Sequence, residues 1–219
     1  MQEIEISEYS TIKLNSYRPL CMNKIGRNAI STYHYPPYID SSCRREPDFQ
    51  NEYPSISALC RAKIFAPTLR EKDIIVYITK KIKQAPYPQK HNSLVAILQV
   101  EEIYPSHQIA QDAYKELNLP IPSNCMVSDN PPYNLDQTGR NPTTSLEGWD
   151  NQYLERSKDN PCFIRTRKIY LNLENPAPIF DNNFIDIFGR IPGTRNPSKI
   201  SKEQLVELAR LAEVELIFK

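Results

Sequence analysis

The sequence predicts an α+β fold, a small mixed β-barrel with peripheral helices and long proline-rich loops. Three observations favour it. Two dense apolar segments rich in β-forming residues lie near the middle of the chain, and a well-capped helix pattern lies near its end. The chain has 19 prolines against 5 glycines, which is typical of stiff, extended loops. Its 219 residues fit one domain, and no repeat or linker divides them.

The first expected elements lie in the tyrosine-rich region. Residues 29–35 (AISTYHY) alternate and contain β-formers, so they predict a strand that ends before Pro36 and Pro37. Residues 56–65 (ISALCRAKIF) are compatible with a short helix or a strand, and we favour a helical or turn-rich segment.

The clearest strands follow. Residues 73–79 (DIIVYIT) predict a central strand, and residues 93–104 (SLVAILQVEEIY) predict a second strand that is buried on both faces. We expect the two to be neighbours in one closed barrel, with the tyrosine-rich strand beside them framing a cleft. The basic, proline-containing residues 80–92 between them predict an exposed hairpin-like loop.

The second half of the chain predicts two helices and one strand. Residues 106–117 form a short amphipathic helix pattern, and residues 201–214 form a longer one in which Ser201 and Gln204 make a capping box. Residues 162–173 (CFIRTRKIYLNL) predict a strand. Residues 118–159 are polar with five prolines and no clear element, which is typical of a functional or partly disordered segment.

Several classes of protein are disfavoured by the sequence. The acidic opening MQEIEISEYS is not a secretory signal, and no apolar run is long enough to cross a membrane, so we expect a cytoplasmic location. Five scattered cysteines without a CxxC pair indicate reduced thiols and predict neither a metal site nor a disulfide framework. No glycine-rich phosphate loop and no nucleophile–base motif is present, so no cofactor and no catalytic residues are expected.

Charge is unevenly distributed along the chain. Residues 10–92 contain 14 Lys/Arg against 6 Asp/Glu, whereas residues 93–219 contain 13 against 17. This asymmetry is compatible with a basic face that attracts an anionic partner, and equally with charges dispersed over the surface.

The order of short motifs resembles the nucleotide-modification-associated domain, type 2. The motifs are Leu59-Cys60-Arg61-Ala62-Lys63, the turn Arg70-Glu71-Lys72-Asp73 before DIIVYIT, the strand LVAILQVEEIYP, Ser128-Asp129-Asn130, and Phe188-Gly189 with Ile191-Pro192-Gly193-Thr194-Arg195. The resemblance departs from the family pattern at Lys72, where a glycine is usual, and at residues 43–47, where a glycine-rich loop is usual.

This resemblance implies a PUA-like barrel of the group that includes ASCH, EVE and YTH domains, which bind RNA or modified bases. It implies one domain over residues 1–219, with a core of about residues 29–215 and an N-terminal extension over residues 1–28.

Candidate binding residues come from aromatic and basic clusters. Tyr33, His34 and Tyr35 offer surfaces on which bases could stack, and packing within the protein is the alternative. Trp149, the only tryptophan, could cap a base or anchor its loop. The remaining candidates could contact phosphates or line a pocket, or could be surface and loop-capping residues: Arg44, Arg45, Cys60, Arg61, Lys63, Asp129 and Asn130.

Three functional hypotheses follow. The first is a module that binds a nucleotide, a modified base or a nucleic acid, DNA or RNA, with salt-sensitive affinity. The second is an enzyme acting on nucleotides or bases, which would need a carboxylate or Cys60 with a perturbed pKa in a pocket. The third is a protein-interaction domain that uses the proline-rich loops between Pro120 and Pro142. No membrane partner is expected, and the oligomeric state stays open.

Overall fold

The structure, a computed structural model, describes residues 2–4, 7, 9–140 and 145–219. The strands are β1 (Gln2–Ile4), β2 (Ile12–Tyr17), β3 (Ser55–Ser57), β4 (Ile74–Thr79), β5 (Asn92–Tyr104), β6 (Phe163–Leu171), β7 (Ala177–Ile179), β8 (Ser198–Ile200) and β9 (Leu216–Phe218). The α-helices are α1 (Lys24–Tyr33), α2 (His107–Glu116), α3 (Leu146–Asp159), α4 (Asp181–Phe188) and α5 (Lys202–Leu211).

One mixed sheet of seven strands organises the molecule. Its order is β3-β6-β5-β4-β2-β8, and β7 pairs with the start of β5. The β2–β4 pair is parallel and the other pairs are antiparallel. Among the described residues no pairing joins the end strands β3 and β8. The α+β class is therefore confirmed, whereas a closed barrel is not, because the three-residue end strands are too short and too far apart in the order to close the sheet.

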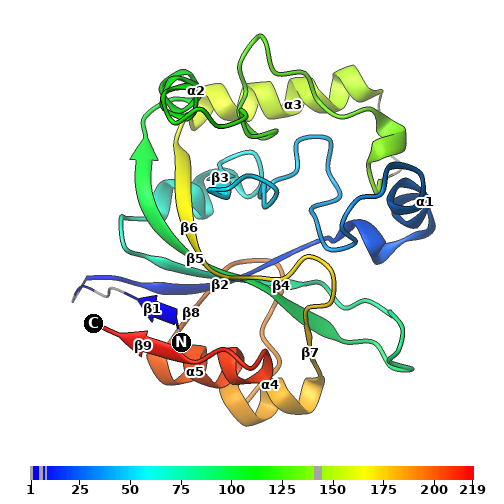
Figure 1. Ribbon diagram of the computed structural model, residues 1–219, viewed down its shortest axis with the longest axis vertical. Helices are drawn as coiled ribbons and strands as arrows, with labels where there is room; N and C mark the ends of the chain where they lie inside the picture. The colour runs from blue at the N-terminus through cyan, green and yellow to red at the C-terminus, as the bar shows by residue number, and fades with distance from the viewer. Residues whose placement is uncertain (1, 5–6, 8, 141–144) are drawn as a thin grey trace.

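The sheet separates two apolar cores. Ile74, Val76 and Ile78 of β4 face one core with Leu205 and Leu208 of α5. Ile75 and Tyr77 face the other core, where the long loops pack. Successive side chains of a strand point to opposite faces, so a strand between two cores is apolar at nearly every position. Figure 1 shows α4 and α5 on one side of the sheet and α1, α2 and α3 on the other.

The strongest sequence patterns are confirmed. The segments DIIVYIT and SLVAILQVEEIY form the antiparallel neighbours β4 and β5, and β4 is central. The predicted helices correspond to α2 and α5, capped by Ser106 and Ser201. The predicted strand at residues 162–173 corresponds to β6, and residues 56–65 are rich in turns.

The strand predicted at residues 29–35 is wrong. Residues 29–33 form the second half of α1, His34 ends the helix in the left-handed conformation, and Tyr35 follows it. The helix begins further upstream, where the Asn23 side chain accepts a hydrogen bond from the Gly26 amide. Such a cap outweighs the β-propensity of a short segment, so the tyrosine-rich strand that was to frame a cleft beside β4 and β5 does not exist.

Two further expectations differ from the structure. The second part of residues 118–159, expected to lack elements, contains α3, which starts at the N-cap Ser145. Residues 1–28, expected as an N-terminal extension, contribute β2, which pairs with β4 along its whole length. In the part of the chain that the structure describes, no helix is both long enough and apolar enough to span a membrane.

Candidate functional site

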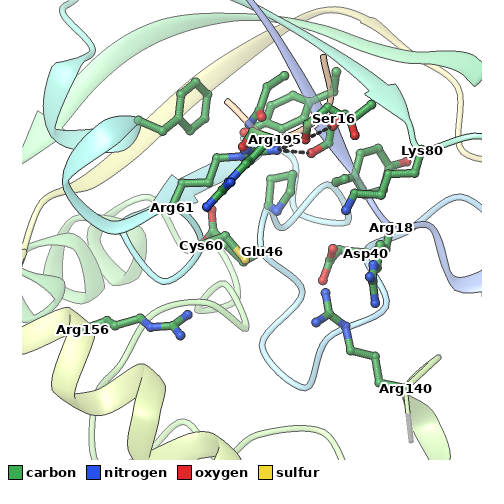
Figure 2. Close-up of a pocket in the computed structure, with 16 residues that line it drawn as sticks. Ser16, Arg18, Asp40, Glu46, Cys60, Arg61, Lys80, Arg140, Arg156 and Arg195 are labelled. Carbon is green, nitrogen blue, oxygen red and sulfur yellow. Dashed lines mark hydrogen bonds between the residues drawn. The ribbon is translucent and has the colours of Figure 1, made fainter. Parts of the chain in front are cut away.

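A cavity of about 380 Å³ opens where β2 and β4 end. Its walls come from these two strands, from the loop after α1, from the segment before β4, from α3 and from the loop between α4 and β8 (Figure 2). The lining residues are Asn15, Ser16, Tyr17, Arg18, Asp40, Glu46, Pro47, Cys60, Arg61, Phe65, Tyr77, Lys80, Arg140, Arg156, Thr194 and Arg195.

The parallel pairing of β2 and β4 brings two cations to one edge of the cavity. Tyr17 pairs with Thr79, and the Lys80 amide donates to the Tyr17 carbonyl at 2.8 Å. Arg18 and Lys80 therefore follow the two strand ends in register, and Figure 2 shows both at the same side of the space. Parallel strands place their carboxyl ends at one sheet edge, where ligands commonly bind in α/β sheets.

Arg61 holds another wall in place. Its guanidinium donates to the Ser16 carbonyl at 2.9 Å, to the Thr194 carbonyl at 3.2 Å, and to the Arg195 carbonyl. Arg61 has a φ of 67°, a left-handed conformation that costs a non-glycine residue about 1 kcal/mol or more. The three hydrogen bonds tie the loop before β8 to β2 and bring Arg195 to the cavity.

Arg140 and Arg156 complete the cationic lining from the α3 side. Arg156 donates to the Leu59 carbonyl at 2.8 Å. The Arg140 guanidinium lies 5.7 Å from the centroid of the Trp149 ring, a cation–π contact that supports it from behind. The Arg140 Nε is buried and has no hydrogen-bond partner among the described residues.

None of the six cations of the lining is neutralised by an ion pair with a described residue: Arg18, Arg61, Lys80, Arg140, Arg156 and Arg195. The closeness of these cations changes the pKa of Lys80. Burial lowers the pKa of the Lys80 ammonium, and the guanidinium groups of Arg18, Arg61 and Arg140 lower it further. A concave site with an excess of positive charge attracts anionic ligands.

Two buried carboxyl groups line the same cavity. Burial raises the pKa of Glu46 to about 8, although Ser57 and Asn124 donate hydrogen bonds to it, so it is mostly protonated at neutral pH. Burial also raises the pKa of Asp40, against the opposing effects of Arg140 and of the Ser42 hydrogen bonds. Two carboxyl groups, one of them mostly neutral, leave the six cations with a large excess of positive charge.

The aromatic residues of the cavity form part of its floor. Tyr17, Phe65 and Tyr77 pack edge to face, with ring centroids of Tyr17 and Tyr77 6.1 Å apart and of Phe65 and Tyr77 6.3 Å apart. The three rings are buried in the core, so they give the cavity only a small apolar surface beside its cations.

Of the predicted site residues, Cys60 and Arg61 line the cavity. Burial raises the pKa of the Cys60 thiol to about 12, so a thiolate nucleophile at neutral pH is not supported. Trp149 lies behind Arg140 and is not part of the lining, and Lys63 is exposed outside it.

The other predicted basic residues stabilise loops. Arg44 is buried and forms a bidentate ion pair with Asp150, at 2.6 and 2.8 Å. Arg45 is 1% exposed, stacks on Tyr35 and Tyr133, and donates to the Asp40 carbonyl. Their charges are already used by the protein.

The remaining predicted residues lie away from the cavity. The Tyr33 and Tyr35 rings stack on each other at 5.6 Å, and His34 is the exposed cap of α1. Asp129 accepts from Gln111, and Asn130 donates to the Pro122 and Cys125 carbonyls. The structure does not bring these residues together with Cys60 and Arg61.

Sequence reasoning missed most of the lining. Arg18 and Lys80 each directly follow a strand, and a cation at a strand end was one signal that the sequence offered. Arg195 belongs to the segment Ile191-Pro192-Gly193-Thr194-Arg195, which the family resemblance had already singled out. For Asn15, Arg140 and Arg156 the sequence contains no such signal, because long-range packing alone places them in the cavity.

Comparisons with known proteins give a distant likeness. No family model matches the chain, and no curated protein matches it. The crystal structure of ASCH from Zymomonas mobilis is 10% identical, with a TM-score of 0.40, over 94% of this chain and 99% of that chain. A mutant of the same protein is 12% identical, with a TM-score of 0.38, over 92% of this chain and 96% of that chain. With TM-scores below 0.5, this likeness carries no argument about family or function, so the PUA-like group and the type 2 nucleotide-modification domain both stay predictions.

Proposed function

We propose that the cavity at the ends of β2 and β4 binds a phosphate-bearing ligand, a nucleotide or the end of a nucleic-acid strand. One observation carries the proposal: six Lys and Arg side chains surround about 380 Å³ without an ion pair to any described carboxylate. Guanidinium and ammonium groups bind phosphate oxygens with charge-assisted hydrogen bonds. A phosphate group would offset the mutual repulsion of these cations.

The aromatic floor of the cavity gives a base little support. Tyr17, Phe65 and Tyr77 expose only 6%, 2% and 1% of their surface, so a base placed beside them would gain small apolar contacts and no open stacking face. The volume lies within the range of about 300–1,000 Å³ that small-molecule sites occupy. Cys60 and Arg61 are the two predicted site residues that this proposal keeps.

The test is to measure the affinity of the full chain for mononucleotides and for a 5′-phosphorylated oligonucleotide by calorimetry or fluorescence anisotropy. We expect Lys80→Gln and Arg140→Gln to raise the Kd about tenfold or more, because each loses a charge-assisted hydrogen bond. The matched control is Lys63→Gln, which removes an exposed cation outside the cavity and should leave the Kd within about twofold.

Salt provides a second measurement on the same proteins. The wild-type Kd should rise between about 50 and about 200 mM salt, and the rise should be smaller in the two cavity variants because they make fewer phosphate contacts. If no nucleotide or oligonucleotide binds at the lower salt, or if Lys63→Gln weakens binding as much as Lys80→Gln, the proposed function is wrong.

An enzyme acting on a bound nucleotide is a second candidate, and one observation favours it. Glu46 is a buried carboxyl whose pKa of about 8 suits a proton donor at neutral pH, and it lines the cavity. Incubating nucleotides with wild-type protein and with Glu46→Gln, and separating the products by chromatography, tests this candidate. Turnover by the wild type alone would support it, and binding without turnover would leave a binding module.

A further inference from the structure

The six cations of the cavity lie on two sides of the space. Figure 2 shows some of them around Asp40 and the others on the side of Cys60. The first set, the Asp40 group, consists of Arg18, Lys80 and Arg140, and the second set, the Cys60 group, consists of Arg61, Arg156 and Arg195.

The members of the Asp40 group are close neighbours. Arg18 and Lys80 follow paired strand ends, and the guanidinium groups of Arg18 and Arg140 both lower the pKa of the Lys80 ammonium, which burial already lowers. Arg140 also opposes the effect of burial on the pKa of Asp40. The side chains of Arg18 and Lys80 form no hydrogen bond and no ion pair with any described residue, so both can bind a ligand.

The Cys60 group is held by main-chain contacts on the opposite side. The Arg61 guanidinium donates to the Arg195 carbonyl, and Arg156 donates to the Leu59 carbonyl at 2.8 Å. Arg195 is exposed, and its side chain bonds to no residue that the structure describes. This group therefore also has a free guanidinium at the cavity.

The two groups face each other across a single space. Arg61 of one group acts on the pKa of Lys80 in the other, and Arg140 opposes the burial that raises the pKa of the Cys60 thiol. The shared cavity has a volume of about 380 Å³. One ligand molecule can therefore contact both groups.

A single phosphate group would leave most of this charge unbalanced or half balanced. The six cations share the lining with two carboxyl groups, Asp40 and Glu46, and Glu46 is mostly protonated at neutral pH. The lining therefore has an excess of at least four positive charges, whereas a terminal phosphate carries about −1.5 to −2 at pH 7. A second phosphate group brings the ligand closer to the charge of its site.

The arrangement of the cations favours two separated phosphates over a chain of adjacent ones. Adjacent phosphates are commonly bound by a glycine-rich loop, whose backbone amides surround them. No described glycine belongs to the lining, and the cations approach on long side chains from two sides. Two phosphates with a sugar between them would direct one negative group toward each set of cations.

We infer that the cavity binds a sugar flanked by two phosphate groups, as at the 5′-phosphorylated end of a nucleic-acid strand, with one phosphate at each cation group. The inference rests on the proposed function and names its ligand class. A mononucleotide would fill one of the two phosphate positions, whereas a strand end or a nucleoside 3′,5′-bisphosphate would fill both.

The first experiment varies the ligand on the wild-type protein, in the absence of divalent cations. The Kd is measured for 5′-AMP, adenosine 3′,5′-bisphosphate, ATP and the 5′-phosphorylated dinucleotide pApA. We expect the bisphosphate to bind about tenfold or more tightly than 5′-AMP, because it makes charge-assisted hydrogen bonds to both groups. It should also bind more tightly than ATP, whose phosphates are adjacent. Binding of pApA at least as tight as that of the bisphosphate indicates a strand end, and weaker binding indicates a free nucleotide with the same two phosphates.

The second experiment removes one cation from each group. Arg18→Gln and Arg195→Gln change exposed side chains, and each should raise the Kd of the bisphosphate about fivefold or more. Only one of the two variants should raise the Kd of 5′-AMP, since a single phosphate contacts one group. Lys63→Gln, outside the cavity, is the control and should leave both Kd values within about twofold.

The outcomes separate this inference from the proposed function. If none of the four ligands binds, the proposed function is wrong, and the inference with it. If 5′-AMP or ATP binds as tightly as the bisphosphate, the cavity binds phosphate but has no second, separated position. Loss of 5′-AMP affinity in both variants would also overturn the inference, because one phosphate would then contact both groups. If a variant does not fold, the ligand series on the wild type still decides the inference.

Discussion

At the scale of single residues, Glu46 carries the clearest consequence of burial in a cationic cavity. Its carboxyl is buried, accepts hydrogen bonds from Ser57 and Asn124, and has its pKa raised from the ordinary 4.5 to about 8. A raised carboxyl pKa means that the folded protein holds a proton that the unfolded chain releases. The contribution of protonated Glu46 to the free energy of unfolding is fully present below about pH 4.5. It is lost as the pH rises from there through about 8.

Replacing Glu46 by Gln should make stability less dependent on pH. Glutamine is neutral at every pH, so the penalty for ionising a buried carboxyl, on the order of a few kcal/mol, disappears. Thermal denaturation from pH 5 to 8 should show a falling Tm for the wild type and a flatter profile for Glu46→Gln. The exposed Glu52→Gln serves as the control and should follow the wild type. Parallel profiles for wild type and Glu46→Gln would contradict the assigned burial effect.

Arg44 and Arg45 show how burial within the protein occupies a charged side chain. Arg44 and Arg45 stand next to each other in the sequence and satisfied the expectation for a phosphate contact. Both are instead bound within the protein, Arg44 to Asp150 and Arg45 to main-chain carbonyls. Whether an arginine is free for a ligand depends on partners far away in the chain, and no local pattern reports them.

At the scale of elements, α1 depends on one glycine. A Cβ on Gly26 would lie 1.7 Å from the Leu20 carbonyl oxygen and 2.7 Å from the Leu20 carbonyl carbon. The helix therefore packs directly on the backbone of the preceding turn, residues 20–22, and only glycine permits this approach. This close packing helps to explain why residues 29–33 are helical in spite of their β-forming composition.

Gly26→Ala should destabilise the protein although alanine is the better helix former. The backbone clash forces α1 to move, which we expect to cost about 2–4 kcal/mol, more than the roughly 1 kcal/mol gained in helix propensity. Urea denaturation measures this difference. Gly193→Ala is the matched control, since a Cβ there meets nothing within 4 Å, and it should change stability by less than about 0.5 kcal/mol. Equal stability of both variants would rule out the close approach.

At the scale of the whole molecule, the fold and the cavity both depend on β2. This strand lies between β4 and β8 in the sheet, and its Ile12, Leu14 and Tyr17 are buried in the two cores. The strand also contributes Asn15 and Ser16 to the cavity and places Arg18 beside Lys80. A chain without β2 would therefore lack part of both apolar cores and part of the cavity lining.

Removal of residues 1–19 should abolish cooperative folding. It deletes the buried side chains of Ile4, Ile12, Leu14 and Tyr17 and leaves the β4 edge unpaired, a loss of several kcal/mol against the roughly 5–15 kcal/mol by which domains are stable. Circular dichroism during heating is the measurement. A chain that starts at Ser10 retains β2 and should unfold cooperatively with a lower Tm, since it loses the buried Ile4. If the chain that lacks residues 1–19 unfolds with the same thermal transition as the full chain, β2 is dispensable.

The sequence by itself determined the elements whose signals are local. Strands β4 and β5 and helices α2 and α5 follow from β-branched runs, periodic apolar residues and N-caps within a few positions, and these physical preferences act over one element. The basic character of residues 10–92 was also visible, and three of the six cavity cations belong to that segment: Arg18, Arg61 and Lys80. Lys80 also follows the best-predicted strand.

Only the tertiary structure decided which charged and polar side chains meet. The parallel pairing of β2 with β4 aligned Arg18 and Lys80, and the packing of α3 and of the loop before β8 added Arg140, Arg156 and Arg195. These contacts join residues far apart in the chain, and their energies depend on burial and on the distance between charges. Such quantities exist only in the folded molecule, which is why the cavity could not be read from local patterns.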